Sequence, residues 1–251
     1  MLFSSVRNLG LPSPANPPAR APRLTAHGLG DPLRPQVEAF IAQVYAQRFG
    51  AQVTHFAPTL VSLRDPLDGS IVAAAGYRPA QHSALFLERY LQAPIESLLA
   101  TPGHTPPERA GIVEVGHLAA QRAGEGRRLI FLLGHHLAAE GAQWVVGTLT
   151  EELRHLFVRL GITPQALGRA DPAALGDDAR QWGSYYDHHP VVLAGQMQQA
   201  LRLLQRRENA RPRELSAAHP EPGLRQAQDD RNTGLRQAQP ERTQDFTGTD
   251  Q

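Results

Sequence analysis

The chain has 251 residues, of which 41% are hydrophobic and 20% are charged, and its formal net charge is +1. This length can bury a substantial core, and the near-neutral charge provides no basic field for nucleic acid or an anionic membrane. There are 0 cysteines, which excludes disulfides, thiolate metal sites and cysteine nucleophiles. All 25 basic residues are arginine, so a catalytic lysine is excluded. No apolar run reaches the ~18 residues of a membrane span, and prolines interrupt the first residues where a signal peptide would lie. We therefore expect a cytoplasmic enzyme without stable membrane insertion.

Both ends of the chain differ in composition from its middle. Residues 1–30 include a proline- and alanine-rich run that is not expected to pack as helix or strand, and we interpret them as a flexible leader. After residue 205 the apolar periodicity is lost, and the hexapeptide Gly-Leu-Arg-Gln-Ala-Gln occurs twice. One duplication in a polar tract does not make a solenoid, so we predict a disordered tail over residues 206–251. One folded domain is then expected over residues 31–205.

Apolar periodicity and turn residues predict alternating helices and strands between these ends. In chain order, they predict a helix from Asp31 to Gly50, a hairpin of strands over 59–63 and 70–77, short helices over 83–91 and 95–99, a strand over 112–116, a helix over 126–140, a strand over 143–149, a helix ending at 160, a strand over 182–186 and a helix over 190–205. This order predicts one α/β domain with a mixed sheet.

A glycine-bearing loop follows the strand over 112–116. It reads Gln121-Arg122-Ala123-Gly124-Glu125-Gly126 and leads into the next helix. Glycines at the start of a helix let the backbone approach a ligand closely, while the free N–H groups and the helix dipole favour an anion. A dinucleotide-binding loop would need Gly-x-Gly-x-x-Gly, and the third glycine is missing here. Arg127 and Arg128 follow directly and could reach a phosphate, or could form a solvated helix face.

The spacing Gln-x-x-Gly-x-Gly between a strand and a helix resembles the pyrophosphate-binding loop of the GNAT-like acyltransferases, and the order of elements is similar to theirs. The resemblance implies a single GNAT-like domain whose mixed central sheet is splayed and flanked by helices. It also implies acyl-CoA or acyl carrier protein as co-substrate, with no permanently bound cofactor. The residues that it assigns to donor binding are the backbone of Leu118 and Ala119, together with Gln121, Arg122, Gly124, Gly126 and Arg127.

Four blocks between about residues 35 and 200 resemble the thermostable hemolysin family, whose pattern is similar to acyltransferases and, more distantly, to acyl-homoserine-lactone synthases. They are 85–91 with 93–96, 112–119, 144–146 and 182–187. The resemblance leads us to expect Asn at position 117, where this chain has His.

Two side chains of the central block are candidates for proton transfer. An amine that attacks a thioester must lose a proton and be held beside the carbonyl. Glu114 could deprotonate this amine or orient it, because a charge in an apolar strand is costly unless it is paired or used. The alternative is a carboxylate paired with an arginine such as Arg78 or Arg89. His117 could also act as the base, since its unperturbed pKa is about 6.5, or could be a histidine at a strand end.

Tyrosine and the remaining histidines give weaker signals. Tyr185 or Tyr186 could return a proton to the leaving thiolate, although one of two adjacent tyrosines usually packs in the core. The pairs at 135–136 and 188–189 are sequence neighbours whose side chains diverge, and neither has the i, i+4 spacing of a helical zinc site. We therefore predict no metal site. Nor does the sequence contain the Gly-x-Ser-x-Gly elbow of a serine hydrolase.

These features together predict an acyltransferase that moves an acyl group, expected to be fatty acyl, from acyl-CoA or acyl carrier protein to a small amine or amino acid acceptor. Two other classes stay open. One is a membrane-active cytolysin, which the family name suggests and the composition opposes. The other is a non-catalytic sensor of acyl thioesters.

Overall fold

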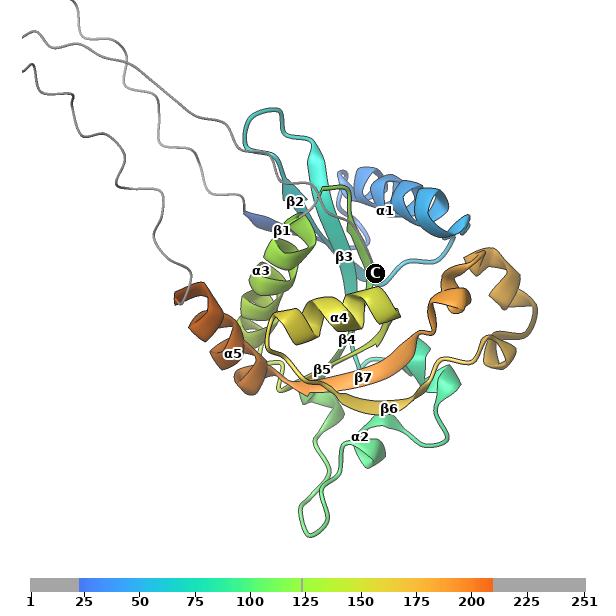
Figure 1. Cartoon of the computed structure of the whole chain (residues 1–251), viewed down its shortest axis with the longest axis vertical. Helices are drawn as coiled ribbons and strands as arrows, with labels where there is room; N and C mark the ends of the chain where they lie inside the picture. The colour runs from blue at the N-terminus through green and yellow to red at the C-terminus, as the bar shows by residue number, and fades with distance from the viewer. Residues whose placement is uncertain (1–22, 123, 210–251) are drawn as a thin grey trace, which may run out of the picture. The chain divides into compact units, whose positions relative to one another are not determined.

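A seven-stranded sheet forms the centre of the part of the chain that the structure describes, residues 23–122 and 124–209 (Figure 1). In this computed structural model the strand order is β1-β2-β3-β4-β5-β7-β6. The strands are β1 Leu24–His27, β2 Thr59–Arg64, β3 Ile71–Pro79, β4 Ile112–Ala120, β5 Trp144–Leu149, β6 Gln165–Arg169 and β7 Val191–Gln196. Strands β4 and β5 are parallel, and the other neighbours in this sheet are antiparallel. The predicted mixed α/β sheet is confirmed.

Helices cover both faces of this sheet. The α-helices are α1 Arg34–Phe49, α2 Ile95–Leu98, α3 Glu125–Ala139, α4 Glu151–Arg159 and α5 Met197–Asn209. Four short 3-10 segments accompany them: η1 Phe86–Tyr90, η2 Arg109–Gly111, η3 Pro172–Trp182 and η4 Tyr185–His188. Helix α1 packs on one face, and α3, with α5 beside it, packs on the opposite face (Figure 1).

Alternation along β3 places small side chains under both helices. Ala73 and Ala75 belong to the apolar core under α3, whereas Ala74 belongs to the core under α1. This follows from the two-residue period of a strand, and the small alanine side chains let both helices pack close to the sheet. Helix α1 ends, as predicted, at Gly50, which adopts the left-handed conformation (φ 66°) that is common for a glycine at a helix C-terminus.

The N-terminal boundary of the domain at residue 30 is wrong. Leu24–His27 form β1, which pairs with β2 within the range assigned to the leader. The His27 side chain is fully buried, and its Nε2 lies 2.9 Å from Ser62 Oγ. Pairing with a distant strand is a tertiary effect that the composition of the leader does not reveal. At the other end, α5 extends to Asn209, four residues past the predicted boundary. Residues 1–22 and 210–251, with the duplicated hexapeptide, lie outside the described part.

The predictions for residues 182–205 also need correction. The strand predicted over 182–186 consists of 3-10 turns, because Gly183 adopts φ 52° and breaks the chain direction there. The helix predicted over 190–205 begins only at Met197, and β7 precedes it. A short apolar run can be a buried strand or a buried helix turn, and periodicity cannot separate them. Here the run over 191–196 forms strand β7, because it lies between β5 and β6 and pairs with both.

The splayed centre that the resemblance implied is present. Strands β4 and β5 pair through Ile112↔Trp144, Val113↔Val145 and Glu114↔Val146, after which the register gives no further pair between them. Strand β4 continues to Ala120 paired with β3 alone. The part of β4 after Glu114 therefore has one edge without a strand partner among the described residues.

A bulge interrupts β4 where it leaves β5. Gly76 opposes Gly116 while Ala74 opposes Ala119, so β4 carries an extra residue on this stretch. His117 adopts φ 54° there, which is uncommon for a residue other than glycine. Bulges of this kind redirect a side chain and often lie next to active sites.

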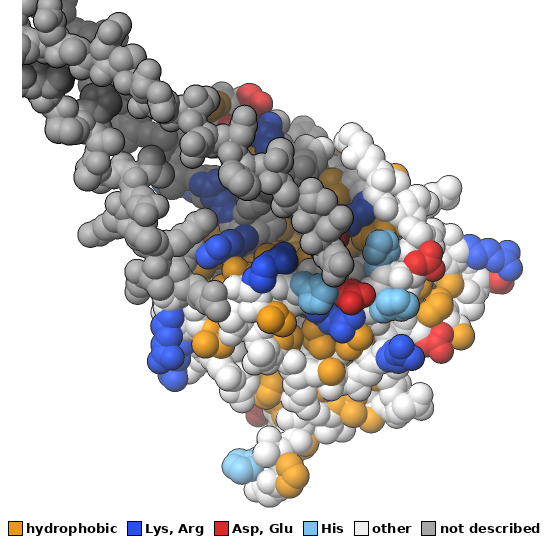
Figure 2. All heavy atoms as spheres, viewed as in Figure 1, with side chains coloured by type: hydrophobic (Ala, Val, Ile, Leu, Met, Phe, Trp, Pro, Cys, Tyr) orange, Lys and Arg blue, Asp and Glu red, His pale blue; other side chains and the backbone are white. Residues whose placement is uncertain are grey.

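No helix of the described residues is both long enough and apolar enough to cross a membrane. On the face shown in Figure 2, outside the grey atoms, acidic and basic side chains both occur, and in places they lie next to each other. This distribution agrees with the net charge of +1.

Candidate active site

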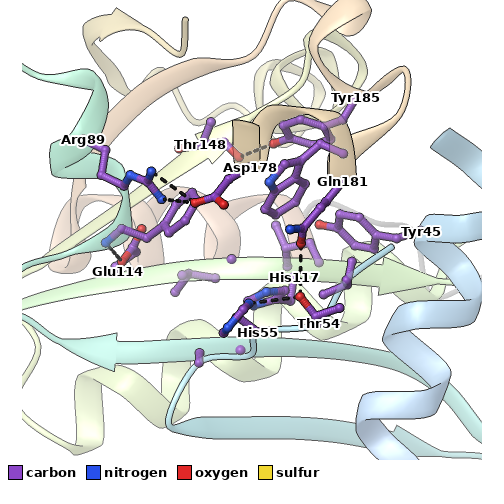
Figure 3. Close-up of a pocket in the computed structure, with 18 of the residues that line it drawn as sticks. Tyr45, Thr54, His55, Arg89, Glu114, His117, Thr148, Asp178, Gln181 and Tyr185 are labelled. Carbon is purple, nitrogen blue, oxygen red and sulfur yellow. Dashed lines mark hydrogen bonds and ion pairs between the residues drawn. The ribbon is translucent and has the colours of Figure 1, made fainter. Parts of the chain in front are cut away.

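A cavity of about 360 Å³ lies on the α1 face of the sheet, where β4 leaves β5. Most of its wall is apolar, but it holds the charged or titratable side chains of Arg78, Glu114 and His117, and we call it the polar cavity. Residues 114–118 of β4 form its floor, and its walls come from the end of α1, the segment 52–57, η1 and the turns over 178–186 (Figure 3). The volume is in the range of small-molecule sites. Glu114, His117 and Tyr185, the three predicted catalytic residues, all line this cavity.

Glu114 holds η1 in place. Its Oε2 accepts the backbone N–H of Phe86 at 2.9 Å, and its Oε1 accepts that of Leu87 at 3.0 Å. These are free N–H groups of the first turn of η1, so a strand side chain caps a turn that is distant in the sequence. Burial raises the pKa of Glu114, while the two N–H bonds and the charge of Arg78 act in the opposite direction. A raised pKa brings this carboxyl group closer to the range of a base at neutral pH.

The two arginines considered as partners of Glu114 behave differently. Arg78, directly across from Glu114 on β3, places its Nε 3.5 Å from Glu114 Oε2. Arg89 instead contacts Asp178 Oδ2 at 3.3 Å through both terminal nitrogens. Figure 3 shows the Arg89–Asp178 pair beside Glu114. The ion pair that was considered as the alternative role of Glu114 is therefore present with Arg78, at a distance longer than a typical hydrogen bond.

His117 is a neutral, half-buried side chain. Burial lowers its pKa to about 4, against a hydrogen bond with the backbone of His55 that acts to raise it. Its Nδ1 is buried and has no hydrogen-bond partner among the described residues. Gly76 gives the ring its space, since a Cβ there would lie 3.1 Å from that nitrogen. An imidazole that is uncharged at neutral pH can accept a hydrogen bond from a ligand.

Tyr185 and Tyr186 both line the cavity, and their hydroxyl groups are bound differently. The Tyr185 hydroxyl donates to the Thr148 carbonyl of β5 at 3.2 Å, next to the place where the strands separate. Burial raises the pKa of Tyr185 well above its usual value. The Tyr186 hydroxyl lies 2.7 Å from that of Tyr90. Tyr185 thus packs in the core beneath α1 and also reaches the gap between the strands.

A second cavity, almost entirely apolar, lies on the opposite face of the sheet between β4, β5 and β7 and the helices α3 and α5. Val115 and Leu118 line both cavities, so the two approach each other at the splayed strands. Gly147 on β5 is required here, because a Cβ at this position would lie 2.7 Å from the Val115 carbonyl oxygen.

The predicted donor-binding residues are separate from the polar cavity, with the exception of Leu118. Ala119 is buried and pairs with Ala74, and Gln121 donates its backbone N–H to the Val72 carbonyl at 3.3 Å. The Arg122 guanidinium contacts Asp65 at 3.1 Å.

The glycine-bearing turn starts α3. Gly124 has the left-handed φ of 93° expected for a glycine at this place, and Gly126 lies in the first turn, where Arg127 is half-buried. The same turn carries Glu125, which pairs with Arg128, so its charge is mixed.

Several cavity residues were not predicted from the sequence. Thr54 donates to Gln181 at 3.1 Å, and the backbone N–H of Gln52 donates to the Gln181 carbonyl at 2.6 Å. These bonds join the segment after α1 to η3 across the mouth of the site. Such loop residues have no periodic signal. Arg78, which follows the strand predicted over 70–77 and lies in β3, was considered from the sequence only as an ion-pair partner of Glu114. Within the described ranges, no group of three or more His, Cys, Asp or Glu side chains could hold a metal ion.

The chain is similar to several solved structures and to one protein-family model. No match was found among curated proteins. Among solved structures, the chain is similar to TofI in complex with an inhibitor and MTA, with 20% identity, 72% of this chain and 96% of that chain covered, and a TM-score of 0.48. For MesI, a CoA-dependent acyl-homoserine lactone synthase, the identity is 17%, the coverage is 78% of this chain and 97% of that chain, and the TM-score is 0.47. For FeeM, an N-acyl amino acid synthase from uncultured soil microbes, the identity is 13%, the coverage is 72% of this chain and 93% of that chain, and the TM-score is 0.48.

The family model described as thermostable hemolysin matches residues 27–201, which is well over half of the sequence. The matched region includes the whole sheet from His27 onward and every residue of the polar cavity. The chain belongs to the thermostable hemolysin family.

Proposed function

We propose that the protein is an acyltransferase that moves an acyl group from a thioester, on coenzyme A or an acyl carrier protein, to a small amine. The observation that supports this most strongly is the opening between β4 and β5. It brings a polar cavity with proton-transfer groups next to an apolar cavity, and Val115 and Leu118 line both. A reaction that joins a polar amine to an acyl chain needs both environments at one point.

The donor is proposed to lie along the open edge of β4. The acyl chain would occupy the apolar cavity, where burial of each methylene contributes about 0.8 kcal/mol. The pantetheine arm would bond to the backbone of Leu118 and Ala119, in the way that an added strand pairs with a sheet edge. Phosphate groups would then reach the start of α3, near Gln121, Arg122, Gly124, Gly126 and Arg127. The free N–H groups of that turn favour an anion.

Proton transfer is assigned to Glu114 and Tyr185, and orientation of the amine to His117. Glu114 takes the proton from the acceptor ammonium, directly or through water, and the neutral amine attacks the thioester carbonyl carbon. The carbon–sulfur bond then breaks as the amide forms, and Tyr185 donates a proton to the departing thiolate. The second proton that the nitrogen loses returns to Tyr185, and Glu114 releases the first to solvent. His117 accepts a hydrogen bond from the amine, which orients the lone pair toward the carbonyl.

The test is thiol release from a panel of acyl-CoAs with pooled amines, measured with a thiol-reactive dye. The protein has 0 cysteines, so it adds no background. We expect amine-dependent release that falls by roughly 10²- to 10⁴-fold in Glu114→Gln, the usual contribution of a general base. Loaded carrier protein replaces acyl-CoA in a second series.

Glu88→Gln is the matched control. Glu88 also accepts two backbone N–H groups, those of Leu85 at 2.7 Å and Ile95 at 3.0 Å, and pairs with Arg109. It does not line the polar cavity. Both variants lose comparable hydrogen bonds, so only the loss of catalysis in Glu114→Gln supports its role as base. Equal activity of the two variants would discard that role, and no release from any donor would favour the sensor over the transferase.

A further inference from the structure

We propose that the acceptor is an α-amino acid whose carboxylate binds the guanidinium group of Arg78 and whose amine lies beside Glu114. This inference rests on the proposed function and specifies the acceptor class for the same cavity. It comes from unused hydrogen-bond donors, from the arrangement of charge and from the position of the opening between the strands.

Arg78 is a half-buried arginine of the cavity wall that has donors to spare. Its side chain is 26% exposed, and within the described residues its hydrogen-bonding and ion-pair contacts amount to Nε at 3.5 Å from Glu114. By contrast, Arg34 donates four hydrogen bonds and Arg109 donates five. A guanidinium group has five N–H donors in a planar fork, and an arginine that lines a cavity with its fork unfilled is suited to a carboxylate of a ligand.

The charges in the cavity match a zwitterion. Arg89 is already neutralised by Asp178, which leaves Arg78 and Glu114 as adjacent groups of opposite sign. Both oxygens of Glu114 accept backbone N–H groups, so the carboxylate is held in one orientation and does not turn to form a close pair with Arg78. An α-amino acid carries its own opposite charges on one carbon atom. Placed against this pair, each of its charges meets a group of opposite sign.

The reaction geometry fits the same placement. Glu114 is the last residue of β4 that pairs with β5, and Val115 at the opening follows it. An amine beside Glu114 therefore lies next to the point where the thioester is proposed to sit. The remaining wall of the cavity is rich in aromatic rings, contributed by Tyr45, Phe86, Tyr90, Trp182 and Tyr186. Such a wall favours an acceptor with an apolar or aromatic side chain.

The test compares a pool of L-amino acids with the matched pool of their carboxamides, which lack the negative charge. Thiol release from acyl-CoA or loaded carrier protein is measured for the wild type, Arg78→Gln and Arg169→Gln. Arg169 is an exposed strand arginine outside the cavity and serves as the control. An α-amino carboxamide is less basic than the acid, so its poorer use would not come from a larger protonated fraction.

We expect the wild type to prefer the acids by at least roughly tenfold in kcat/KM, in line with a charge-assisted hydrogen bond. Arg78→Gln should remove this preference by lowering kcat/KM for the acids while changing that for the amides less than about threefold. Arg169→Gln should behave as the wild type. Equal use of acids and amides by the wild type, or a preference that survives in Arg78→Gln, overturns the inference and leaves the transferase intact.

Binding of the pooled amino acids without donor, followed by ligand-observed NMR, separates the two hypotheses. Binding that is lost in Arg78→Gln supports the inference even where no thiol is released, a result that would discard the transferase alone. Absence of thiol release together with absence of amino acid binding to the wild type overturns both.

Discussion

Replacement of His117 by Asn should remove a specific part of the pH dependence of stability. His117 is half-buried and uncharged in the folded protein, where desolvation lowers its pKa to about 4, against about 6.5 in an unfolded chain. The unfolded state therefore binds more protons as the pH falls, and stability that is present above pH 6.5 is lost on the way down to pH 4. Asn does not titrate and tolerates the left-handed backbone, φ 54°, better than most residues.

The size of the effect follows from the two pKa values. A difference of about 2.5 units corresponds to about 3 kcal/mol when both states are protonated. At pH 5 the folded state remains mostly unprotonated and the unfolded state is mostly protonated, so about 2 kcal/mol is already lost relative to pH 8. This loss is a large share of the usual total stability of about 5–15 kcal/mol.

Urea denaturation at pH 8 and pH 5 measures the free energy of unfolding for the wild type, His117→Asn and His104→Asn. His104 is exposed and serves as the control. Contributions of the other titrating groups are common to all three proteins and cancel in the comparison. The wild type and the control should each lose about 2 kcal/mol more than His117→Asn between the two pH values. The reasoning is refuted if His117→Asn loses as much stability as the wild type.

Three further substitutions test other parts of the structure. Gly183→Ala should lower the free energy of unfolding by roughly 3 kcal/mol or more in urea denaturation, because a Cβ would meet the backbone of the last residue of α1 at a positive φ; a loss below about 1 kcal/mol would contradict this. Tyr185→Phe should cost about 1 kcal/mol of stability, since the Thr148 carbonyl loses its donor. It should also lower kcat by roughly tenfold or more in the thiol-release assay, and an unchanged kcat would remove Tyr185 from the mechanism. Leu201→Phe, in the wall of the apolar cavity, should move the preference in kcat/KM toward shorter acyl chains, and an unaltered chain-length profile would place the acyl chain elsewhere.

Two matched variants accompany these measurements. Gly195→Ala adds a Cβ where nothing lies within 4 Å and the backbone φ is negative, so it should change stability by less than about 1 kcal/mol. Tyr186→Phe breaks the hydroxyl contact with Tyr90 and leaves Thr148 bonded. It should therefore retain a higher kcat than Tyr185→Phe.

Local sequence patterns predicted the elements that carry their own signal. Helix α1 was predictable because its apolar residues share one face and Gly50 ends it. The strand with Glu114 and the glycines before α3 were predictable for the same kind of reason, and they led to the acyltransferase interpretation. The position of Glu114 could be predicted as costly, because a carboxylate in an apolar strand needs a partner. Whether Glu114 acts as a base or as the partner of an arginine could not be predicted from the sequence.

Only the tertiary structure decided how these elements meet. The bulge at His117, the end of pairing after Glu114 and the close approach of Gly147 to Val115 depend on the register between distant segments. The insertion of β7 and the capping of η1 by Glu114 depend on it too. A sequence pattern records which face of a segment is buried, because burial repeats with the period of the helix or strand. It does not record which segment covers that face. The two cavities and the free donors of Arg78 depend on which segments pack against each other, which the pattern does not record.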